Sequence, residues 1–239
     1  MNALLDVQNV SRHFGGVRAL HEVSLKVMEG VITGLIGPNG AGKTTLFNLM
    51  SGVDRPTTGR ILLAGKDLHG LKPHQVCGRG MARTFQNIRL FGKMSVMDNV
   101  QVGRHLRGGD STDGEALRRL EMVGLSGHEE EMASSLPYGL QRRLEIARAL
   151  ATDPRILLLD EPAAGLNPTE TDDMTRLIRS IAKTGVTVVL IEHDMRLVMG
   201  LCDRIAVLDH GETIAEGTPV EIRLDPRVRE AYLGEGSHA

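Results

Sequence analysis

Near residue 40 the chain reads Gly37-Pro38-Asn39-Gly40-Ala41-Gly42-Lys43-Thr44, the complete G-x-x-x-x-G-K-[ST] pattern of a phosphate-binding loop. The apolar residues 32–36 come directly before it and predict a short strand, and a helix is predicted from Lys43 onward. The pattern is specific for polyphosphates when a strand precedes it and a helix follows it. The chain is therefore predicted to bind a nucleoside triphosphate, in preference to the alternative of a glycine-rich turn without a ligand.

Each residue type in this loop has a physical role. Glycines let backbone N–H groups turn inward around a polyphosphate, because side chains would block that approach. Lys43 can reach the outer phosphates, and Thr44 can place its hydroxyl on Mg²⁺. The start of the helix adds its positive dipole end to the same anion site. The predicted nucleotide-binding set is Gly37, Pro38, Asn39, Gly40, Ala41, Gly42, Lys43, Thr44 and Thr45.

The composition narrows the classes of protein to consider. The 239 residues carry 28 Lys plus Arg and 30 Asp plus Glu, so the formal charge is −2 and no basic excess indicates nucleic acid. The two cysteines, Cys77 and Cys202, lack zinc-site spacing and favour a reduced, cytosolic protein without a disulfide framework. We expect no signal peptide, and the apolar runs are shorter than the ~18 residues that span a bilayer. If the protein works at a membrane, we expect another subunit to cross it.

Alternation of short β-branched runs with helical stretches predicts an α/β fold with a mostly parallel core sheet. Amphipathic, antiparallel strands are expected at 4–10 and 23–27, and a strand at 58–65 is expected to complete this N-terminal part. The remaining core is expected to contain strands at 32–36, 156–159, 186–191, 205–208 and 212–215 and a helix at 168–183.

The middle of the chain has a different character. From Lys66 to about Leu136 it is rich in Gly, His and Arg, and residues 115–123 have helical periodicity, which predicts a smaller, mostly helical lobe. Residues 140–150 predict an amphipathic helix, and residues 108–114 predict a mobile surface loop. The chain is therefore interpreted as a single domain, residues 1–239, with a helical subdomain inserted at about residues 87–152.

A second motif narrows the chemistry. The apolar residues 156–159 predict a buried strand that ends in two adjacent carboxylates, Asp160 and Glu161. Because ligands bind at the carboxyl ends of strands in open α/β sheets, Asp160 is predicted to hold Mg²⁺. Glu161 is predicted to polarise the attacking water as the catalytic base. The alternative is an ordinary exit from a strand into a loop.

Three further residues are candidates for contacts with the nucleotide. His193 follows the predicted strand 186–191 and can point an imidazole at the γ-phosphate, although a single His there is ordinarily a surface residue. Gln86 offers a side-chain carbonyl to Mg²⁺ and can sense the nucleotide, or is simply a polar loop residue. Phe14, in a polar stretch of a chain poor in aromatic residues, stacks on an adenine ring or belongs to the core. Lys43, Glu161 and His193 form the predicted catalytic set.

In this order, the motifs resemble those of the ATP-binding subunits of ABC transporters. The resemblance covers nearly the whole chain and is closest to the branched-chain amino acid uptake ATPases. It rests on the stretches 83–91 (Arg-Thr-Phe-Gln-Asn-Ile-Arg-Leu-Phe), 162–168 (Pro-Ala-Ala-Gly-Leu-Asn-Pro) and, near the C-terminus, 221–223, 225–226 and 231–234.

The resemblance implies the P-loop ABC ATPase fold, Mg²⁺-dependent ATP hydrolysis and a location at the cytoplasmic face of the cell membrane. It also implies that two such subunits pack head to tail with ATP between them, so that ATP binding closes the pair. The implied partners are integral membrane permease subunits, a second ATPase and, indirectly, an external substrate-binding protein. Residues 94–100 are the candidate docking surface for the permease, unless their methionines fill the core of the helical lobe.

Two departures from the family pattern concern the site. The usual signature Leu-Ser-Gly-Gly-Gln is replaced at 136–140 by Leu136, Pro137, Tyr138, Gly139 and Leu140, so the serine hydroxyl expected at the γ-phosphate of the facing subunit is missing. The backbone N–H of Gly139 and the following helix N-terminus remain as an anion site. Asn167 replaces an aspartate common in the family and can bridge the subunits through its amide.

Other classes of function are weighed against this one. A soluble ABC ATPase that acts on ribosomes or DNA would ordinarily have two cassettes, a long coiled coil or a basic surface, none of which the sequence indicates. A P-loop kinase for a small metabolite would have no use for a signature loop. The sequence does not identify the cargo, and the subfamily favours a heterodimer of two different ATPases.

Overall fold

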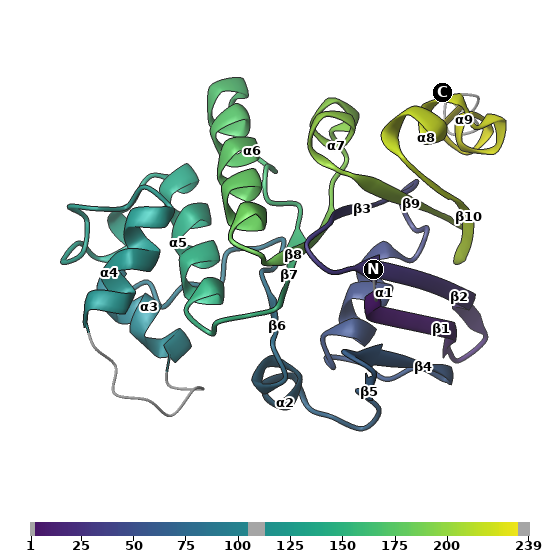
Figure 1. Ribbon diagram of the computed structural model, residues 1–239, viewed down its shortest axis with the longest axis horizontal. Coiled ribbons are helices and arrows are strands. Elements are labelled where there is room, and N and C mark those ends of the chain that lie inside the picture. The colour runs from purple at the N-terminus through teal and green to yellow at the C-terminus, as the bar shows by residue number, and fades with distance from the viewer. Residues whose placement is uncertain (1–2, 105–112, 234–239) are drawn as a thin grey trace.

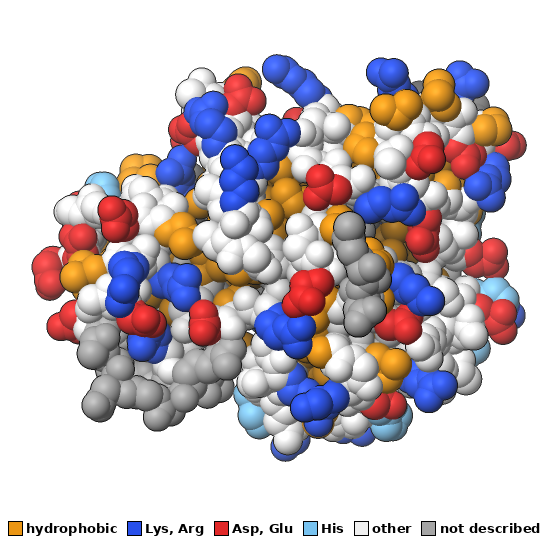
Figure 2. Space-filling model, viewed as in Figure 1, with side chains coloured by type: hydrophobic (Ala, Val, Ile, Leu, Met, Phe, Trp, Pro, Cys, Tyr) orange, Lys and Arg blue, Asp and Glu red, His pale blue; other side chains and the backbone are white. Residues whose placement is uncertain are grey.

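The computed structural model describes residues 3–104 and 113–233. Two sheets and a group of helices make up the chain, with the helices α3 to α6 at one end and the N-terminal sheet at the other (Figure 1). Acidic and basic side chains are interspersed on the face shown in Figure 2. Most of the loop predicted at 108–114 lies outside the described residues, and its last two residues begin helix α4 (Asp113–Met122).

The N-terminal sheet is antiparallel, as predicted. Its strand order is β2-β1-β4-β5, with β1 (Ala3–Phe14), β2 (Val17–Met28), β4 (Thr58–Leu63) and β5 (Lys66–Asp67). Leu5 and Val7 alternate with half-buried polar residues in β1, which is the period of a strand with one face in the core. That apolar face packs on helix α1 (Lys43–Met50) through Leu46 and Phe47, both fully buried.

The larger sheet is mostly parallel and has the order β10-β9-β3-β8-β7-β6. Its strands are β3 (Ile32–Ile36), β6 (Met81–Arg83), β7 (Ile156–Asp160), β8 (Thr187–Ile191), β9 (Arg204–Asp209) and β10 (Glu212–Gly217). Every residue of β3, β7 and β8 is buried, which is why these strands appear in the sequence as mostly apolar runs without polar alternation. Only β10 is antiparallel to its neighbour.

The helical lobe begins later in the chain than Lys66. The strands β5 and β6 and the helix α2 (Pro73–Gly78) fall within residues 66–83, and β6 pairs in parallel with β7 in the core sheet. This part of the prediction was wrong because a strand of three residues has no detectable period. The lobe itself consists of α3 (Val96–Arg104), α4 and α5 (Tyr138–Leu150), which pack on one another around Val100, Leu120 and Leu144.

The remaining helices pack on the core sheet or form the C-terminal part of the described chain. They are α6 (Pro168–Lys183), α7 (Met195–Leu201), α8 (Pro219–Leu224) and α9 (Pro226–Leu233). The bounds of α6 agree with the prediction, since Asn167 caps its first turn and Pro168 occupies the first helical position. Among the described residues, no helix is long and apolar enough to cross a bilayer.

Candidate active site

The phosphate loop lies between the ends of β3 and α1, and two of its glycines are required by close packing. A side chain at Gly37 would place its Cβ 1.9 Å from the carbonyl oxygen of Leu208 in β9, and Gly37 has φ +148°. At Gly42, with φ +100°, a Cβ would lie 2.6 Å from Leu20. Lys43 is buried and its ammonium donates to the carbonyl oxygens of Gly37 and Pro38, at 2.6 and 2.8 Å. The lysine that is predicted to meet phosphates is thus held along the loop.

A pocket of about 320 Å³ opens over this loop. It brings together groups from three parts of the chain, because Gln86, Glu161 and His193 line it together with the loop. Its wall is completed by Ala19, Asn39, Gly40, Ala41, Gly42, Lys43, Thr44 and Thr45. The pocket therefore combines backbone N–H groups and a cation for phosphates with a carboxylate that faces them.

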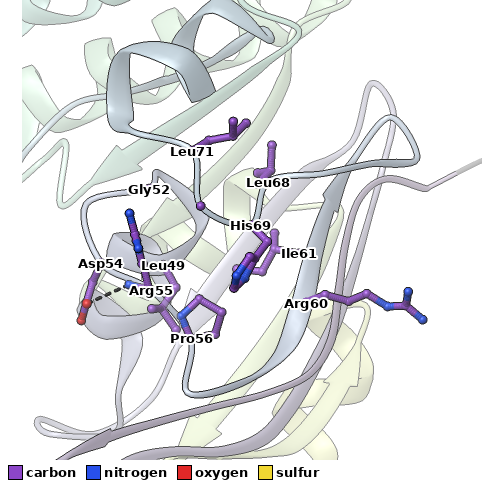
Figure 3. A pocket seen from close by; sticks show the side chains of 11 residues that line it. Leu49, Gly52, Asp54, Arg55, Pro56, Arg60, Ile61, Leu68, His69 and Leu71 are labelled. Carbon is purple, nitrogen blue, oxygen red and sulfur yellow. Dashed lines mark hydrogen bonds between the residues drawn. The ribbon is translucent and has the colours of Figure 1, made fainter.

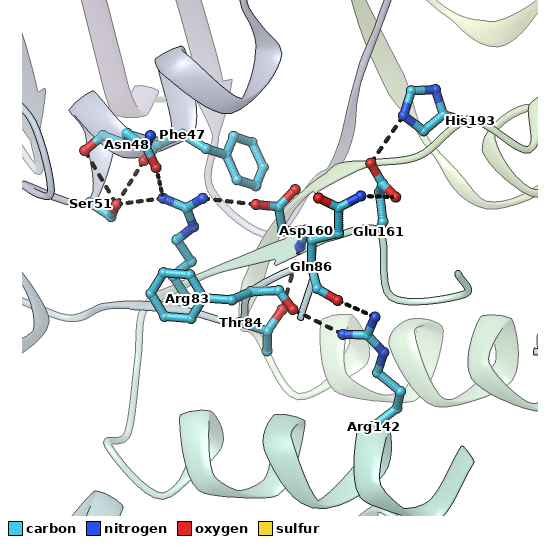
Figure 4. Close-up of polar contacts among 11 residues, drawn as sticks. Phe47, Asn48, Ser51, Arg83, Thr84, Gln86, Arg142, Asp160, Glu161 and His193 are labelled. Carbon is cyan, nitrogen blue, oxygen red and sulfur yellow. Dashed lines mark hydrogen bonds and ion pairs between the residues drawn. The ribbon is translucent and has the colours of Figure 1, made fainter. Parts of the chain in front are cut away.

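Glu161 is held from both sides. One carboxylate oxygen lies 3.0 Å from Nε2 of His193, and the other accepts a hydrogen bond of 3.0 Å from the Gln86 amide (Figure 4). The Glu161 backbone has φ +49°, a left-handed conformation that costs a non-glycine residue about 1–3 kcal/mol and that is typical of functional sites. The carboxylate is thereby fixed in one orientation at the mouth of the pocket, as a base for a bound water requires.

The order of the sheet explains why Glu161 and His193 meet. The strands β7 and β8 are parallel neighbours, with Asp160 opposite Ile191, so their carboxyl ends lie side by side. Glu192 ties the two loops together because its carboxylate accepts hydrogen bonds from the backbone N–H of Ala163, at 2.8 Å, and of His193, at 3.2 Å. Burial raises the pKa of Glu192.

Asp160 is buried at the end of β7 and forms an ion pair of 2.8 Å with Arg83. It does not line the pocket itself, but the residue after it does. Thr44 and Gln86 do line the pocket, and hydroxyl and amide oxygens are ligands that suit Mg²⁺. No group of three His, Cys, Asp or Glu within 3–104 and 113–233 is arranged to hold a metal.

Phe14 is exposed, so the alternative of a core position is excluded. The residue is 47% exposed at the end of β1, and the Arg12 guanidinium lies 4.3 Å from the ring centroid. A stacking role for adenine stays a prediction. A separate pocket near β4 (Figure 3), lined by Leu49, Arg55 and Ile61 among others, has a volume of about 20 Å³ and holds no more than about one water.

The signature residues and Asn167 do not line the pocket and instead lie beside each other. Pro137 is the N-cap residue of α5, and Tyr138 begins that helix with its side chain 45% exposed. A Cβ on Gly165 would lie 3.2 Å from the Tyr138 ring, and one on Gly139 would lie 3.1 Å from a Glu170 oxygen. Leu140 is half-buried against the core.

Asn167 has an intramolecular role that the sequence did not indicate. Its side-chain oxygen accepts a hydrogen bond of 3.0 Å from the backbone N–H of Glu170, and the Glu170 carboxylate accepts one of 2.9 Å from the backbone N–H of Asn167. This capping box starts α6. A bridge from Asn167 to a second subunit stays a prediction.

Three residues that the motifs did not single out contribute to the site, namely Arg83, Arg142 and Glu192. Arg142 of α5 donates to the backbone carbonyls of Phe85, at 2.9 Å, and of Gln86, so the helix that begins at the signature loop also holds the loop of Gln86. In the sequence, these three residues are marked only as charged residues that lie at the end of an apolar strand or among the apolar residues of a helix. Such signals are too common to be interpreted before the packing is known.

A profile described as "ABC transporter" matches residues 20–164, a range that contains the phosphate loop and the Asp160-Glu161 pair. The chain belongs to the ABC transporter family. A second profile, described as "Branched-chain amino acid ATP-binding cassette transporter", matches residues 212–238 of this ABC ATPase. The prediction of an ATP-hydrolysing enzyme with an α/β ABC ATPase fold is confirmed by the family and by its solved structures.

Curated relatives align over nearly the whole ABC ATPase. The high-affinity branched-chain amino acid transport ATP-binding protein BraF of Pseudomonas aeruginosa is 47% identical, with 97% of this chain and 98% of BraF covered. LivG of Escherichia coli, with the same description, is also 47% identical over 97% and 98% of the two chains. The lipopolysaccharide export system ATP-binding protein LptB of Escherichia coli is 36% identical, with 98% of each chain covered.

Solved structures show the same fold. The ADP conformation of MJ1267, an ATP-binding cassette of an ABC transporter, has a TM-score of 0.91 at 31% identity and covers 98% of this chain and 100% of MJ1267. A dimeric structure of the bacterial ABC transporter cassette MJ0796 has a TM-score of 0.81 at 27% identity, with 90% and 98% of the chains covered.

Proposed function

We propose that this chain is the ATP-hydrolysing subunit of an importer for branched-chain or related amino acids. The observation that carries the catalytic part is the pocket in which Glu161, held by Gln86 and His193, faces the phosphate loop. The cargo class is supported by the 47% identity to BraF and LivG, against 36% to the export protein LptB, and by the profile matched at residues 212–238.

The roles follow from positions in the pocket. Lys43 and the loop N–H groups bind the outer phosphates, and entry of ATP replaces the bonds of Lys43 to the loop carbonyls. Glu161 orients the water that attacks the γ-phosphate, and His193 contacts the same phosphate from the end of β8. Thr44, Gln86 and Asp160 would hold Mg²⁺, which neutralises charge on the phosphate oxygens when bound.

We propose that the working unit is a head-to-tail pair of two such subunits. The signature residues Pro137 to Leu140 lie outside the pocket of their own chain, at an exposed helix start, where they are accessible to the ATP of a facing subunit. ATP then belongs to the interface and favours the closed pair, and hydrolysis lets the pair reopen. In this subfamily we expect two different ATPases in the pair.

For the permease we propose a groove rather than residues 94–100 as the docking site. Val96 and Val100 are fully buried and Met97 packs partly on the core, so this stretch belongs mainly to the helical lobe itself. A groove of about 410 Å³ lies between α2, β6 and α5 and has a largely apolar lining that includes His74, Phe85 and Phe91. An exposed aromatic groove fits a short apolar helix of a membrane subunit.

The proposed location is the cytoplasmic face of the cell membrane, where permease subunits receive the ATPase and an external substrate-binding protein delivers the amino acid. The test is a mild-detergent pull-down of the tagged chain from its native membranes, followed by mass spectrometry. Integral membrane subunits with a second ATPase are the expected result. Ribosomal or DNA-repair proteins without a membrane partner would replace this proposal by a soluble ABC ATPase.

Cargo is tested separately by uptake of labelled leucine in cells that lack the chain. The wild-type chain should restore uptake, whereas the Glu161→Gln variant at equal abundance should not. Restored uptake by that variant would separate transport from hydrolysis at this site.

A further inference from the structure

We propose that Arg83 is a positioning residue that holds the Asp160 carboxylate ready for Mg²⁺ before the nucleotide arrives. The inference rests on the proposed Mg²⁺-dependent ATP site. It concerns a residue that does not line the pocket over the loop.

The Arg83 guanidinium, at the end of β6, joins strand β7 to helix α1 (Figure 4). Its Nη2 donates to Asp160 at 2.8 Å, at the end of β7. Its Nη1 donates to the side-chain oxygen of Asn48 at 2.7 Å and to the hydroxyl of Ser51 at 3.0 Å. Asn48 belongs to α1, the helix that begins in the phosphate loop, and Ser51 follows its last residue. One side chain thus fixes the carboxylate relative to the helix that carries Lys43 and Thr44.

The ion pair is shielded from water. The side chains of Arg83 and Asp160 are 6% and 5% exposed, and Arg83 lies 5.6 Å from the ring centroid of Phe47 and 4.9 Å from that of Phe85. Its Nε is buried and has no hydrogen-bond partner among the described residues. A guanidinium held this way is fixed by its two Nη groups and by the aromatic faces, so it cannot follow the carboxylate if that side chain moves.

The physical consequence concerns the carboxylate. A buried ionised group that loses its partner is strongly unfavourable, so without Arg83 the Asp160 side chain would rotate or draw in water. With Arg83 present, the carboxylate keeps one orientation and no reorganisation is needed when the cation enters. Removal of Arg83 should therefore weaken the contribution of Mg²⁺ to nucleotide binding and leave the contribution of the phosphate loop nearly intact.

The test is titration of the purified chain with a fluorescent ATP analogue, with EDTA or with increasing free Mg²⁺. In Arg83→Met, the Mg²⁺ concentration that gives half of the maximal increase in affinity for the analogue is expected to rise about tenfold or more, because one charge-assisted hydrogen bond is lost. The affinity for the analogue without Mg²⁺ should stay within about twofold of the wild-type value. Arg83→Lys should recover part of the effect, because a lysine keeps the charge but cannot contact both sides.

Arg155→Met is the matched control. Arg155 precedes the same strand β7 at its other end and forms an ion pair of 2.8 Å with Glu29, so its loss removes an ion pair without touching Asp160. It should leave both affinities unchanged. A Mg²⁺ requirement in Arg83→Met that stays the same or falls would overturn the proposal, as would an equal loss of Mg²⁺-free affinity.

Should Arg83→Met not fold, the Arg83→Lys variant decides, and an unchanged Mg²⁺ requirement in it overturns the proposal. Failure of the wild-type chain to bind the analogue at all would instead contradict the proposed ATP site. The two failures are therefore distinguishable.

Discussion

At the scale of single residues, Lys43 and Glu161 both line one small pocket. Lys43 is bound to the carbonyls of its own loop, and Glu161 is bound to Gln86 and His193. Both side chains are thus held before ATP is present. Nucleotide binding, which is assigned to Lys43, can therefore be tested separately from hydrolysis, which is assigned to Glu161, by substitution of one side chain at a time.

Lys43→Ala is expected to abolish productive ATP binding, since the loop loses its only cation directed at the outer phosphates. Isothermal titration calorimetry with ATP and Mg²⁺ should show that the affinity for ATP is weaker by about tenfold or more, which corresponds to the loss of one charge-assisted contact. The far-ultraviolet circular dichroism spectrum should be unchanged. Wild-type affinity in a folded variant would contradict the assignment of Lys43.

Glu161→Gln is expected to bind ATP but to hydrolyse it about 10²–10⁴-fold more slowly, the usual contribution of a general base. A glutamine keeps the size and one hydrogen-bonding oxygen, so the loop at φ +49° should be retained. Phosphate release at saturating ATP is the measurement. Turnover at the wild-type rate would remove Glu161 from the catalytic role.

At the scale of elements, two local devices place the functional loops. The capping box of Asn167 and Glu170 starts α6 beside the signature loop, and Glu192 joins the loops that follow β7 and β8. None of these three residues lines the nucleotide pocket. Their effects should therefore appear in stability.

Asn167→Ala should lower the free energy of unfolding by about 1 kcal/mol, because the N-cap hydrogen bond to Glu170 is lost. Asn167→Asp is the matched control, since aspartate caps helices as well as asparagine does. Urea unfolding followed by circular dichroism measures both. If the two substitutions lowered the free energy of unfolding equally, loss of the N-cap hydrogen bond would not explain the effect of Asn167→Ala.

Glu192 predicts a pH dependence of stability. Burial raises its pKa, so the folded chain retains this proton at pH values where the unfolded chain releases it. The contribution of Glu192 to stability should then fall as the pH rises from the ordinary carboxyl pKa of 4.5 through the raised value. When the free energy of unfolding is measured in urea over a series of pH values, the Glu192→Gln variant should not show this decline. Its values should differ from those of the wild type only by an amount that is the same at every pH. An identical slope in variant and wild type would contradict the prediction.

At the scale of the whole molecule, the nucleotide pocket and the signature loop lie on separate parts of the chain. The pocket lies between the loop at the start of α1 and the ends of β7 and β8, whereas the signature loop begins α5 in the helical lobe. Arg142 links these parts, because it extends from α5 to the backbone of Gln86. In the proposed head-to-tail pair, the helical lobe of one subunit would lie against the ATP that is bound to the other subunit.

Mixed with its partner ATPase, the Glu161→Gln variant is expected to form the closed pair with ATP and Mg²⁺ but not with ADP, because in the proposed pair the γ-phosphate would bridge the two subunits. Adding Gly139→Asp should abolish dimerisation, since a carboxylate would face the γ-phosphate. An acidic residue in the first turn of α5 suits the helix dipole, but its Cβ would lie 3.1 Å from a Glu170 carboxylate oxygen. Circular dichroism and monomer ATP affinity are therefore measured beside the dimer, to show that the double variant is folded. Light scattering after size exclusion measures the dimer. A dimer in the double variant would contradict the role of this loop.

The sequence by itself determined the phosphate loop, the strand that ends in Asp160 and Glu161, and helix α6. These features depend on neighbouring residues: a glycine pattern, an apolar run and an amphipathic period. The three-residue strand β6 could not be predicted, because it is too short for a period and is stabilised by its pairing with β7. The exposure of Phe14 at the end of β1 was equally undecided.

Only the tertiary structure decided which of these groups meet. Gln86 lies 75 residues from Glu161, His193 lies 32 residues from it, and Arg83 lies 77 residues from Asp160. Their contacts follow from the order β3-β8-β7-β6, which brings the carboxyl ends of distant strands to one edge of the sheet. Local sequence chemistry specifies what each group can do, whereas the pairing of strands far apart in the chain specifies which groups act together.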